Sequence, residues 1–275
     1  ILRELGVEFR TGVEVGKDTS LAQLRADGYK AFYLAVGAQA GRRLGIEGED
    51  AQGVMTGVDF LRAVNLGEDV KLGGKVVVIG GGNVAVDVAR AAARVGASGV
   101  DMYCLESRAE MPALGEEIDE AMAEKIGIEN SWGPKRVIVE GGRVTGVEFK
   151  KCVSVFDENK RFAPKFDESV TKLVEASAVL VSVGQAMDWG SLLEGSAVEL
   201  NPNKTAKADA TTYQSAESDV VVGGDAFTGP KFAIDAIAAG KEAAISIHRF
   251  VQPGQNLLFG RTKRAYKDFD KDAVA

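Results

Sequence analysis

The feature that most constrains the fold is an apolar run that ends in three consecutive glycines and leads directly into an alanine-rich segment. Residues 75–79 (Lys-Val-Val-Val-Ile) have the length and β-branched composition of a buried strand. Residues 83–95 have helical spacing and are followed by Gly96, a typical residue at a helix end. A strand joined to a helix in this way is typical of α/β domains with a largely parallel sheet.

The glycine run contains the pattern G-x-G-x-x-A, with Gly80, Gly82 and Ala85 at its key positions. Between a strand and a helix, the first glycine makes a tight turn and the second lets the backbone approach a pyrophosphate. The small third residue allows close helix–strand packing. Free N–H groups at the helix start, near Asn83 and Val84, would then hold the phosphates. The pattern predicts a dinucleotide site, and a glycine-rich turn in an ordinary α/β domain is the alternative.

Glu106 ends the next expected strand, 100–105, and lies 24 positions after Gly82. A carboxylate at this place accepts hydrogen bonds from the ribose hydroxyls and repels a 2′-phosphate, so it favours NADH. Arg108 stands close behind it and would pair with a 2′-phosphate if NADPH were the cofactor.

Further segments repeat the strand–glycine design. Buried strands are expected at 31–37, 178–184 and 219–224, and antiparallel strands at roughly 136–174. The segments 33–38 and 181–186 both read as a strand followed by Val-Gly, which fits two similar nucleotide-binding folds, one inserted in the other.

A second candidate site lies near the C-terminus, where Gly224 and Asp225 end an expected strand and a long helix is expected over 232–250. An acid at the carboxyl end of a parallel strand suits a second nucleotide. Capping of a turn by Asp225 explains the same residue equally well.

Composition excludes several other classes. The 275 residues are enough for about two domains. A net charge of −7 disfavours a nucleic-acid partner. Cys104, Cys152 and the single His248 form no metal or redox motif, and no apolar run is long enough for a membrane span, so we expect a cytoplasmic protein. The sequence starts at Ile1, in what reads as a helix end before a strand at 7–10, so we expect a piece of a longer protein.

Together these residues resemble the pyridine-nucleotide:flavin oxidoreductases, specifically the glutamate synthase small (beta) subunit-like family. The resemblance also rests on Glu-Met-Pro at 110–112 and on Gly-Gly-Asp followed by Thr-Gly-Pro at 223–230. It implies an α/β fold in which a Rossmann-like, three-layer NAD(P)-binding domain, 69–214, is inserted in a partial FAD-binding domain. That second domain would comprise 1–68 and 215–275, the latter including a C-terminal tail.

The resemblance also implies where a flavin would bind. Gly37 and Gly224 would belong to the FAD site, and Asp225 would hydrogen-bond the ribityl chain. The backbone around Phe232 and Ala233 would face the isoalloxazine ring. The family's motif for the FAD pyrophosphate and its N-terminal iron–sulfur cysteines would precede Ile1.

On the nicotinamide side, the resemblance implies that Gly184 and Gln185 line the cleft. NADPH-specific members tend to carry Arg where Leu105 and Glu106 stand, which again points to NADH. The expected function is hydride transfer between nicotinamide and FAD, with electrons passed to a partner subunit or an iron–sulfur centre. No side chain is expected to act as a catalytic acid or base. A non-catalytic nucleotide-binding module of a larger redox complex is the alternative.

Overall fold

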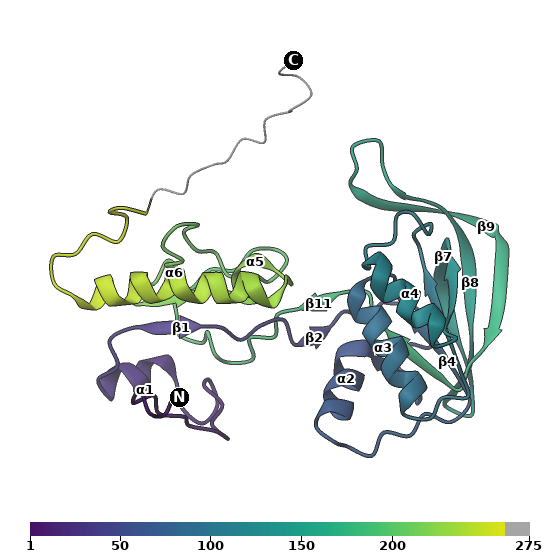
Figure 1. The fold of residues 1–275 in the computed structure, drawn as a ribbon, viewed down its shortest axis with the longest axis horizontal. Helices are drawn as coiled ribbons and strands as arrows, with labels where there is room; N and C mark the ends of the chain where they lie inside the picture. The colour runs from purple at the N-terminus through teal and green to yellow at the C-terminus, as the bar shows by residue number, and fades with distance from the viewer. Residues whose placement is uncertain (262–275) are drawn as a thin grey trace. The chain divides into compact units, whose positions relative to one another are not determined.

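A computed structural model describes residues 1–261, and the predicted tail at 262–275 lies outside this part of the chain. The chain forms two compact units. The first is made of Ile1–Ala38 together with the chain from Ala186 onward, and the second is Gln39–Gln185. Figure 1 labels the helices and strands of both units.

The second unit is built on a five-stranded sheet in which every pairing is parallel, with the strand order β3-β10-β4-β5-β6. The predicted α/β class is therefore confirmed. The strands are β3 (Val54–Thr56), β4 (Lys75–Ile79), β5 (Gly99–Cys104), β6 (Gly127–Asn130) and β10 (Ala178–Val181). The helices α2 (Gly57–Asn65), α3 (Asn83–Arg94) and α4 (Gly115–Ala123) follow β3, β4 and β5 along the chain.

Strand β4 shows why its sequence is continuously apolar. Val76 and Val78 pack with residues of all three helices, whereas Val77 and Ile79 face the opposite side of the sheet. Successive side chains of a strand point to opposite faces, so a strand covered on both faces needs apolar residues at every position. The alanine-rich face of α3, from Ala85 to Ala92, lets this helix lie close to the sheet.

The opposite face of the sheet is covered by an antiparallel meander of β7 (Trp132–Glu140), β8 (Arg143–Phe156) and β9 (Phe162–Glu175). Tyr103 of β5 stacks on Phe149 of β8 with ring centroids 4.3 Å apart. The unit therefore has three layers, which are helices, parallel sheet and antiparallel sheet (Figure 1). This matches the expected antiparallel segment and the expected three-layer arrangement.

The first unit contains a parallel pair of short strands, β1 (Phe32–Leu34) and β12 (Val220–Val222). The helices of this unit are α1 (Leu21–Ala26), α5 (Asp225–Thr228) and α6 (Ala233–Val251). Its core joins residues from both chain segments, including Leu21 and Leu34 from the first and Trp189 and Val198 from the second. The short strands β2 (Ala40–Gly41) and β11 (Gln185–Ala186) pair with each other where the chain passes from one unit to the other.

The units divide at positions other than the predicted boundaries 68/69 and 214/215. Residues 39–68 belong to the second unit because β3 extends its sheet and Phe60 of α2 is completely buried in its core. Residues 186–214 belong to the first unit because Met187, Trp189 and Ala206 complete its core. Each segment carries apolar side chains that either core could bury, so only packing shows which core it enters.

The start of the chain also differs from expectation. Residues 1–6 form turns rather than the end of a helix, and residues 7–10 are not a strand. Leu5 and Phe9 are exposed there and Val7 is 44% exposed, so these side chains gain no burial that would fix regular structure.

Candidate dinucleotide site

Gly80 follows β4 with a φ of +145°, a conformation that side chains of L-residues rarely adopt. A Cβ at this position would lie 2.3 Å from the backbone oxygen of Ser182, which follows β10. The two loops are held together by the Ser182 N–H, which donates to the Ile79 carbonyl at 2.7 Å. The fold itself therefore requires glycine at position 80.

Gly82 differs from Gly80 in both respects. Its φ of −93° is available to any residue, and the nearest atom to a Cβ built there is Pro112 Cγ at 3.9 Å. Gly82 is the N-cap of α3, but it has no side chain to cap the helix. Glycine here leaves an open space in front of a helix start, which is the geometry that an approaching pyrophosphate needs.

The backbone amides at the start of α3 also fit the binding of a pyrophosphate. The helical ladder begins with the Ala85 and Val86 N–H groups, which donate to the Gly82 carbonyl. Among residues 1–261, the N–H groups of Gly82, Asn83 and Val84 have no protein acceptor. Three unpaired donors at the positive end of the helix dipole form an anion-binding arrangement.

The side chain of Asn83 is committed within the protein. Its Oδ1 accepts a hydrogen bond from the Leu114 N–H at 2.8 Å, at the N-cap of α4. The Ala113 N–H donates to the Gly81 carbonyl at 3.2 Å. These bonds attach the loop 107–114 to the glycine turn and hold the Asn83 side chain through its oxygen.

Glu106 lies beside the glycine turn. Its Oε2 is 2.9 Å from the position of a Cβ on Gly81, which brings the two segments of the predicted site together. The backbone oxygen of Glu106 accepts from the Ser131 N–H at 3.0 Å and from Asn130 Nδ2 at 3.1 Å. Sequence reasoning did not single out Asn130 and Ser131. Their only signal was their place at the end of β6, the neighbour of β5: Asn130 is its last residue and Ser131 follows it.

Arg108 contacts a carboxylate within the protein. Its Nη2 lies 3.2 Å from Asp119 Oδ1 of α4, and both side chains are largely exposed. An exposed ion pair of this kind contributes little to stability, about 0–1 kcal/mol. The side chain is therefore held only weakly away from a nucleotide.

Cys104 forms a wall of the same turn. Its Cβ lies 2.9 Å from the Cβ position of Gly81, and its Sγ accepts from Asn130 Nδ2 at 3.2 Å. Burial, and then the charge of Glu106, raises the pKa of the Cys104 thiol to about 11. A neutral, buried thiol packs as a small apolar side chain.

Gly184 and Gln185 follow β10, the parallel neighbour of β4. Gly184 has a φ of +110°, and its carbonyl accepts from the Arg42 N–H at 3.0 Å. In the strand order β3-β10-β4-β5-β6, the chain leaves β4 toward β5 on one side, and β10 lies on the other. The carboxyl ends of β4 and β10 therefore border the crevice where open α/β sheets bind ligands.

The residues expected around a flavin lie in the first unit. Gly37 has a φ of +70° and Gly224 a φ of +62°, both in the left-handed region that favours glycine. Asp225 opens α5, and its Oδ1 accepts from the Lys231 N–H at 3.2 Å. This is the turn-capping role that was the alternative for Asp225. Phe232 is the N-cap of α6 and Ala233 its first residue, and both are exposed.

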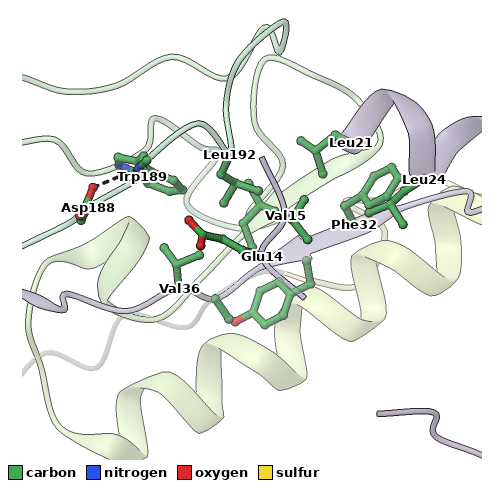
Figure 2. A pocket seen from close by; sticks show the side chains of 13 residues that line it. Glu14, Val15, Leu21, Leu24, Phe32, Val36, Asp188, Trp189 and Leu192 are labelled. Atoms are coloured by element: carbon green, nitrogen blue, oxygen red, sulfur yellow. Dashed lines mark hydrogen bonds between the residues drawn. The ribbon is translucent and has the colours of Figure 1, made fainter. Parts of the chain in front are cut away.

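The first unit also has a pocket of about 580 Å³ beside β1, which the sequence did not predict (Figure 2). Apolar side chains such as Val15, Leu24, Val36 and Leu192 line it, together with the carboxylate-bearing residue Glu14. The residues expected around a flavin are not among those that line this pocket.

No group of three His, Cys, Asp or Glu side chains in residues 1–261 could hold a metal ion. No helix in this part of the chain is both long enough and apolar enough to cross a membrane.

A parallel sheet with a glycine turn, an uncapped helix start and an acid after the neighbouring strand defines the class of nucleotide-binding α/β proteins. Residues 2–240 match the family described as pyridine nucleotide-disulphide oxidoreductase. The chain belongs to this family, which confirms the resemblance found in the sequence.

Two curated relatives show how the chain compares with longer proteins. It is 35% identical to the NADP(+)-dependent formate dehydrogenase subunit beta of Moorella thermoacetica, over 92% of this chain and 36% of that protein. It is 30% identical to the glutamate synthase [NADPH] small chain of Escherichia coli strain K12, over 92% of this chain and 57% of that protein. The chain therefore spans only about a third to three fifths of the lengths of these relatives.

Among solved structures, the chain resembles Mycobacterium tuberculosis FprA in complex with NADPH, with a TM-score of 0.70 and 18% sequence identity. The match covers 86% of this chain and 67% of FprA. It also resembles the thioredoxin reductase of T. acidophilum, with a TM-score of 0.60 and 20% identity over 80% of this chain and 65% of that one. These likenesses concern the fold.

Proposed function

We propose that this chain is the nicotinamide-binding part of an NADH-dependent flavin oxidoreductase that passes electrons to a partner subunit or an iron–sulfur centre. The observation that carries the proposal is the open space at Gly82. A Cβ there would meet nothing closer than 3.9 Å, and three unpaired N–H groups face the same helix start. A glycine that the fold does not require is explained by a ligand that approaches the backbone.

The residues around the turn fit a dinucleotide. The start of α3 binds the pyrophosphate through its amides and its dipole. Glu106, beside Gly81, accepts hydrogen bonds from the ribose hydroxyls of the adenosine half. The same carboxylate repels a 2′-phosphate, so the preferred cofactor is NADH. Gly184 and Gln185 line the nicotinamide side of the crevice.

The family resemblance assigns the flavin to the first unit. Gly37 and Gly224 allow close backbone approach, and Asp225 carries a carboxylate at the end of β12. Helix α6 begins at Ala233 without a side-chain cap, so its first amides are available to a ligand. When both cofactors are bound, they supply the hydride chemistry themselves. The residues of the chain bind and orient the cofactors and exclude water.

The names of the relatives support a partner in electron transfer. The formate dehydrogenase relative is a beta subunit, and so is the NADPH-Fe(3+) oxidoreductase of Geobacter sulfurreducens, which is 31% identical over 94% of this chain. Both names specify NADP(H). The glutamate at position 106 predicts the opposite preference for this chain.

Calorimetric titration with NADH and with NADPH tests the proposal. We expect NADH to bind at least about tenfold more tightly than NADPH. Repulsion between the Glu106 carboxylate and the 2′-phosphate should weaken the binding free energy of NADPH by about 1.4 kcal/mol or more. Gly82→Asp is expected to abolish NADH binding, because its side chain occupies the pyrophosphate position and adds a negative charge. Unchanged affinity in Gly82→Asp would overturn the dinucleotide site.

A second pair of variants tests the selectivity. Glu106→Gln is expected to narrow the preference for NADH, while Glu116→Gln, which removes an exposed carboxylate of α4, leaves it unchanged. If NADPH binds more tightly to the wild-type chain, Arg108 is the selecting residue. Reduction of a dye by NADH in the presence of FAD then separates an enzyme from a nucleotide-binding assembly module, because the module would bind NADH without reducing the dye.

A further inference from the structure

Arg42 lies against the loop that follows β10 and has no role among the residues described above. Its backbone N–H donates to the Gly184 carbonyl at 3.0 Å, and its Nε donates to the Gln185 carbonyl at 3.2 Å. Its Cδ is 3.5 Å from the position of a Cβ on Gly184. The arginine is therefore fixed along the loop that follows β10.

The chain before Arg42 is held equally closely. A Cβ on Gly41 would lie 2.4 Å from Thr56 Cβ, so glycine there lets the backbone pass directly against the end of β3. The position of Arg42 is thus set by backbone contacts on both sides. An arginine anchored through Nε keeps its terminal nitrogens available to donate to two oxygens of an anion such as a phosphate.

The neighbouring Arg43 provides a contrast. Its Nη2 lies 2.5 Å from Asp50 Oδ1, and its Nε lies 3.8 Å from Glu49 Oε2. Arg42 is exposed, and no carboxylate in residues 1–261 lies within ion-pair distance of it. Of these two adjacent guanidinium groups, the protein pairs that of Arg43 with carboxylates and leaves that of Arg42 beside the loop after β10.

The glycine turn lacks a cation of its own. The segment 80–86 carries no charged side chain, so amides and the helix dipole alone would face the two charges of a pyrophosphate. Arg108 lies toward the opposite end of the site, where it pairs with Asp119 behind Glu106. A basic residue on the β10 side would supply the missing charge.

We propose that Arg42 binds the phosphate on the nicotinamide side of the dinucleotide. The inference rests on the proposed function, because the direction of the ligand follows from Glu106. With the adenosine ribose at Glu106 after β5 and the pyrophosphate at the start of α3, the nicotinamide half extends past β4 toward β10. The loop that carries Gly184, Gln185 and the guanidinium of Arg42 lies on that side.

The test compares Arg42→Gln with Arg43→Gln, which removes the same charge from the adjacent position. Calorimetry measures the binding of NADH, ADP-ribose and AMP to each chain. ADP-ribose keeps both phosphates but lacks the nicotinamide, and AMP keeps only the phosphate of the adenosine half. We expect Arg42→Gln to weaken NADH and ADP-ribose about tenfold, the effect of losing one charge-assisted hydrogen bond. AMP should bind Arg42→Gln, and all three ligands should bind Arg43→Gln, within about twofold of the wild-type affinity.

The other outcomes overturn the inference in different ways. Wild-type affinity for NADH in Arg42→Gln would show that the guanidinium does not reach the ligand. An equal loss for AMP would show a general charge effect, and so would an equal loss in Arg43→Gln. A loss for NADH but not for ADP-ribose would place Arg42 on the nicotinamide ring instead of the phosphate. If the wild-type chain binds none of the three ligands, the proposed function itself fails together with the inference. Urea unfolding of each variant confirms that the compared chains are folded.

Discussion

Each compact unit contains a junction at which a strand ends in glycines before a helix, and the two junctions use their glycines differently. After β12, a Cβ on Gly223 would lie 2.3 Å from Tyr33 Oη, and Gly224 has a φ of +62°. Both glycines are therefore required by the protein. After β4, Gly80 is required in the same sense, but Gly82 has an ordinary φ and open space around it. A glycine points to a ligand where the fold gives no other reason for it.

The largest expected effect on stability comes from Gly80→Ala. The added Cβ would meet the Ser182 carbonyl at 2.3 Å in a backbone conformation that alanine avoids. We expect a loss of about 3 kcal/mol in the free energy of unfolding. Urea unfolding measures it. Gly96→Ala is the matched control, since Gly96 has a φ of +103° with no atom within 4 Å of its Cβ position. It should lose only about 1 kcal/mol.

Gly82→Ala tests whether the fold requires glycine at position 82. If this variant destabilises the chain as much as Gly80→Ala, the two glycines do not differ in this respect. We expect its free energy of unfolding to stay within about 0.5 kcal/mol of wild type. Its affinity for NADH should fall sharply, because the methyl group occupies space reserved for the pyrophosphate. A variant that keeps both its stability and its affinity would remove the distinction between the two glycines.

Gly223→Ala tests the other junction. Its Cβ would press on the Tyr33 ring, with Oη at 2.3 Å and ring carbons at 2.9 Å, so overpacking should cost about 2 kcal/mol. Adding Tyr33→Phe removes the nearest atom and should restore part of this loss. A double-mutant cycle by urea unfolding gives the coupling between the two positions. Purely additive losses would show that the tyrosine is not what excludes a side chain at 223.

Asn83→Ala is expected to have a smaller effect. It removes the bond from the Leu114 N–H to Asn83 Oδ1, which ties the 107–114 loop to the glycine turn. We expect a loss of about 1 kcal/mol in stability. Hydrogen exchange of the Leu114 amide should accelerate, while the amides of β12 in the other unit exchange as before. Unchanged exchange at Leu114 would mean that the loop is held without this bond.

The smallest expected effect is on the pH dependence of the free energy of unfolding, because the Cys104 thiol contributes no pH dependence near neutrality. Burial and the charge of Glu106 raise the pKa of Cys104 to about 11, against an ordinary value of 9.0. The folded chain thus holds the thiol proton more tightly than the unfolded chain does. This stabilisation is complete below about pH 9 and is lost as the pH rises toward about 11. Urea unfolding between these values should show a shallower decline for Cys104→Ala. An identical decline would exclude the thiol as its source.

Much of the second unit could be predicted from local patterns. The strand 75–79, the helix after it and the antiparallel segment are all present in the structure. Their periodicity and glycine positions are local properties of the sequence, and burial on both faces of β4 follows from its uninterrupted apolar run. The start of the chain was predicted less well. A segment that alternates apolar and charged residues, such as 7–10, forms a strand only where a neighbouring strand pairs with it.

The residues of the candidate site also fall into those that local sequence patterns predicted and those that they did not. Gly80, Gly82 and Glu106 were predicted from spacing alone, because dinucleotide sites of this kind have fixed positions on one strand–turn–helix unit and the strand after it. Asn130, which bonds the Glu106 carbonyl, and Arg42, which bonds the Gln185 carbonyl, come from segments distant in the sequence. No local pattern marks them. Their roles depend on which strands become neighbours.

By itself, the sequence determined the α/β class, the glycine turn and the acid that follows it, because each depends on the conformational preferences of a few consecutive residues. Only the tertiary structure decided which core takes up 39–68 and 186–214, and that the side chain of Asn83 is already committed to Leu114. It also decided which glycines are free to serve a ligand. That distinction depends on distances to atoms far away in the chain, such as the Ser182 carbonyl at Gly80 and the open space at Gly82.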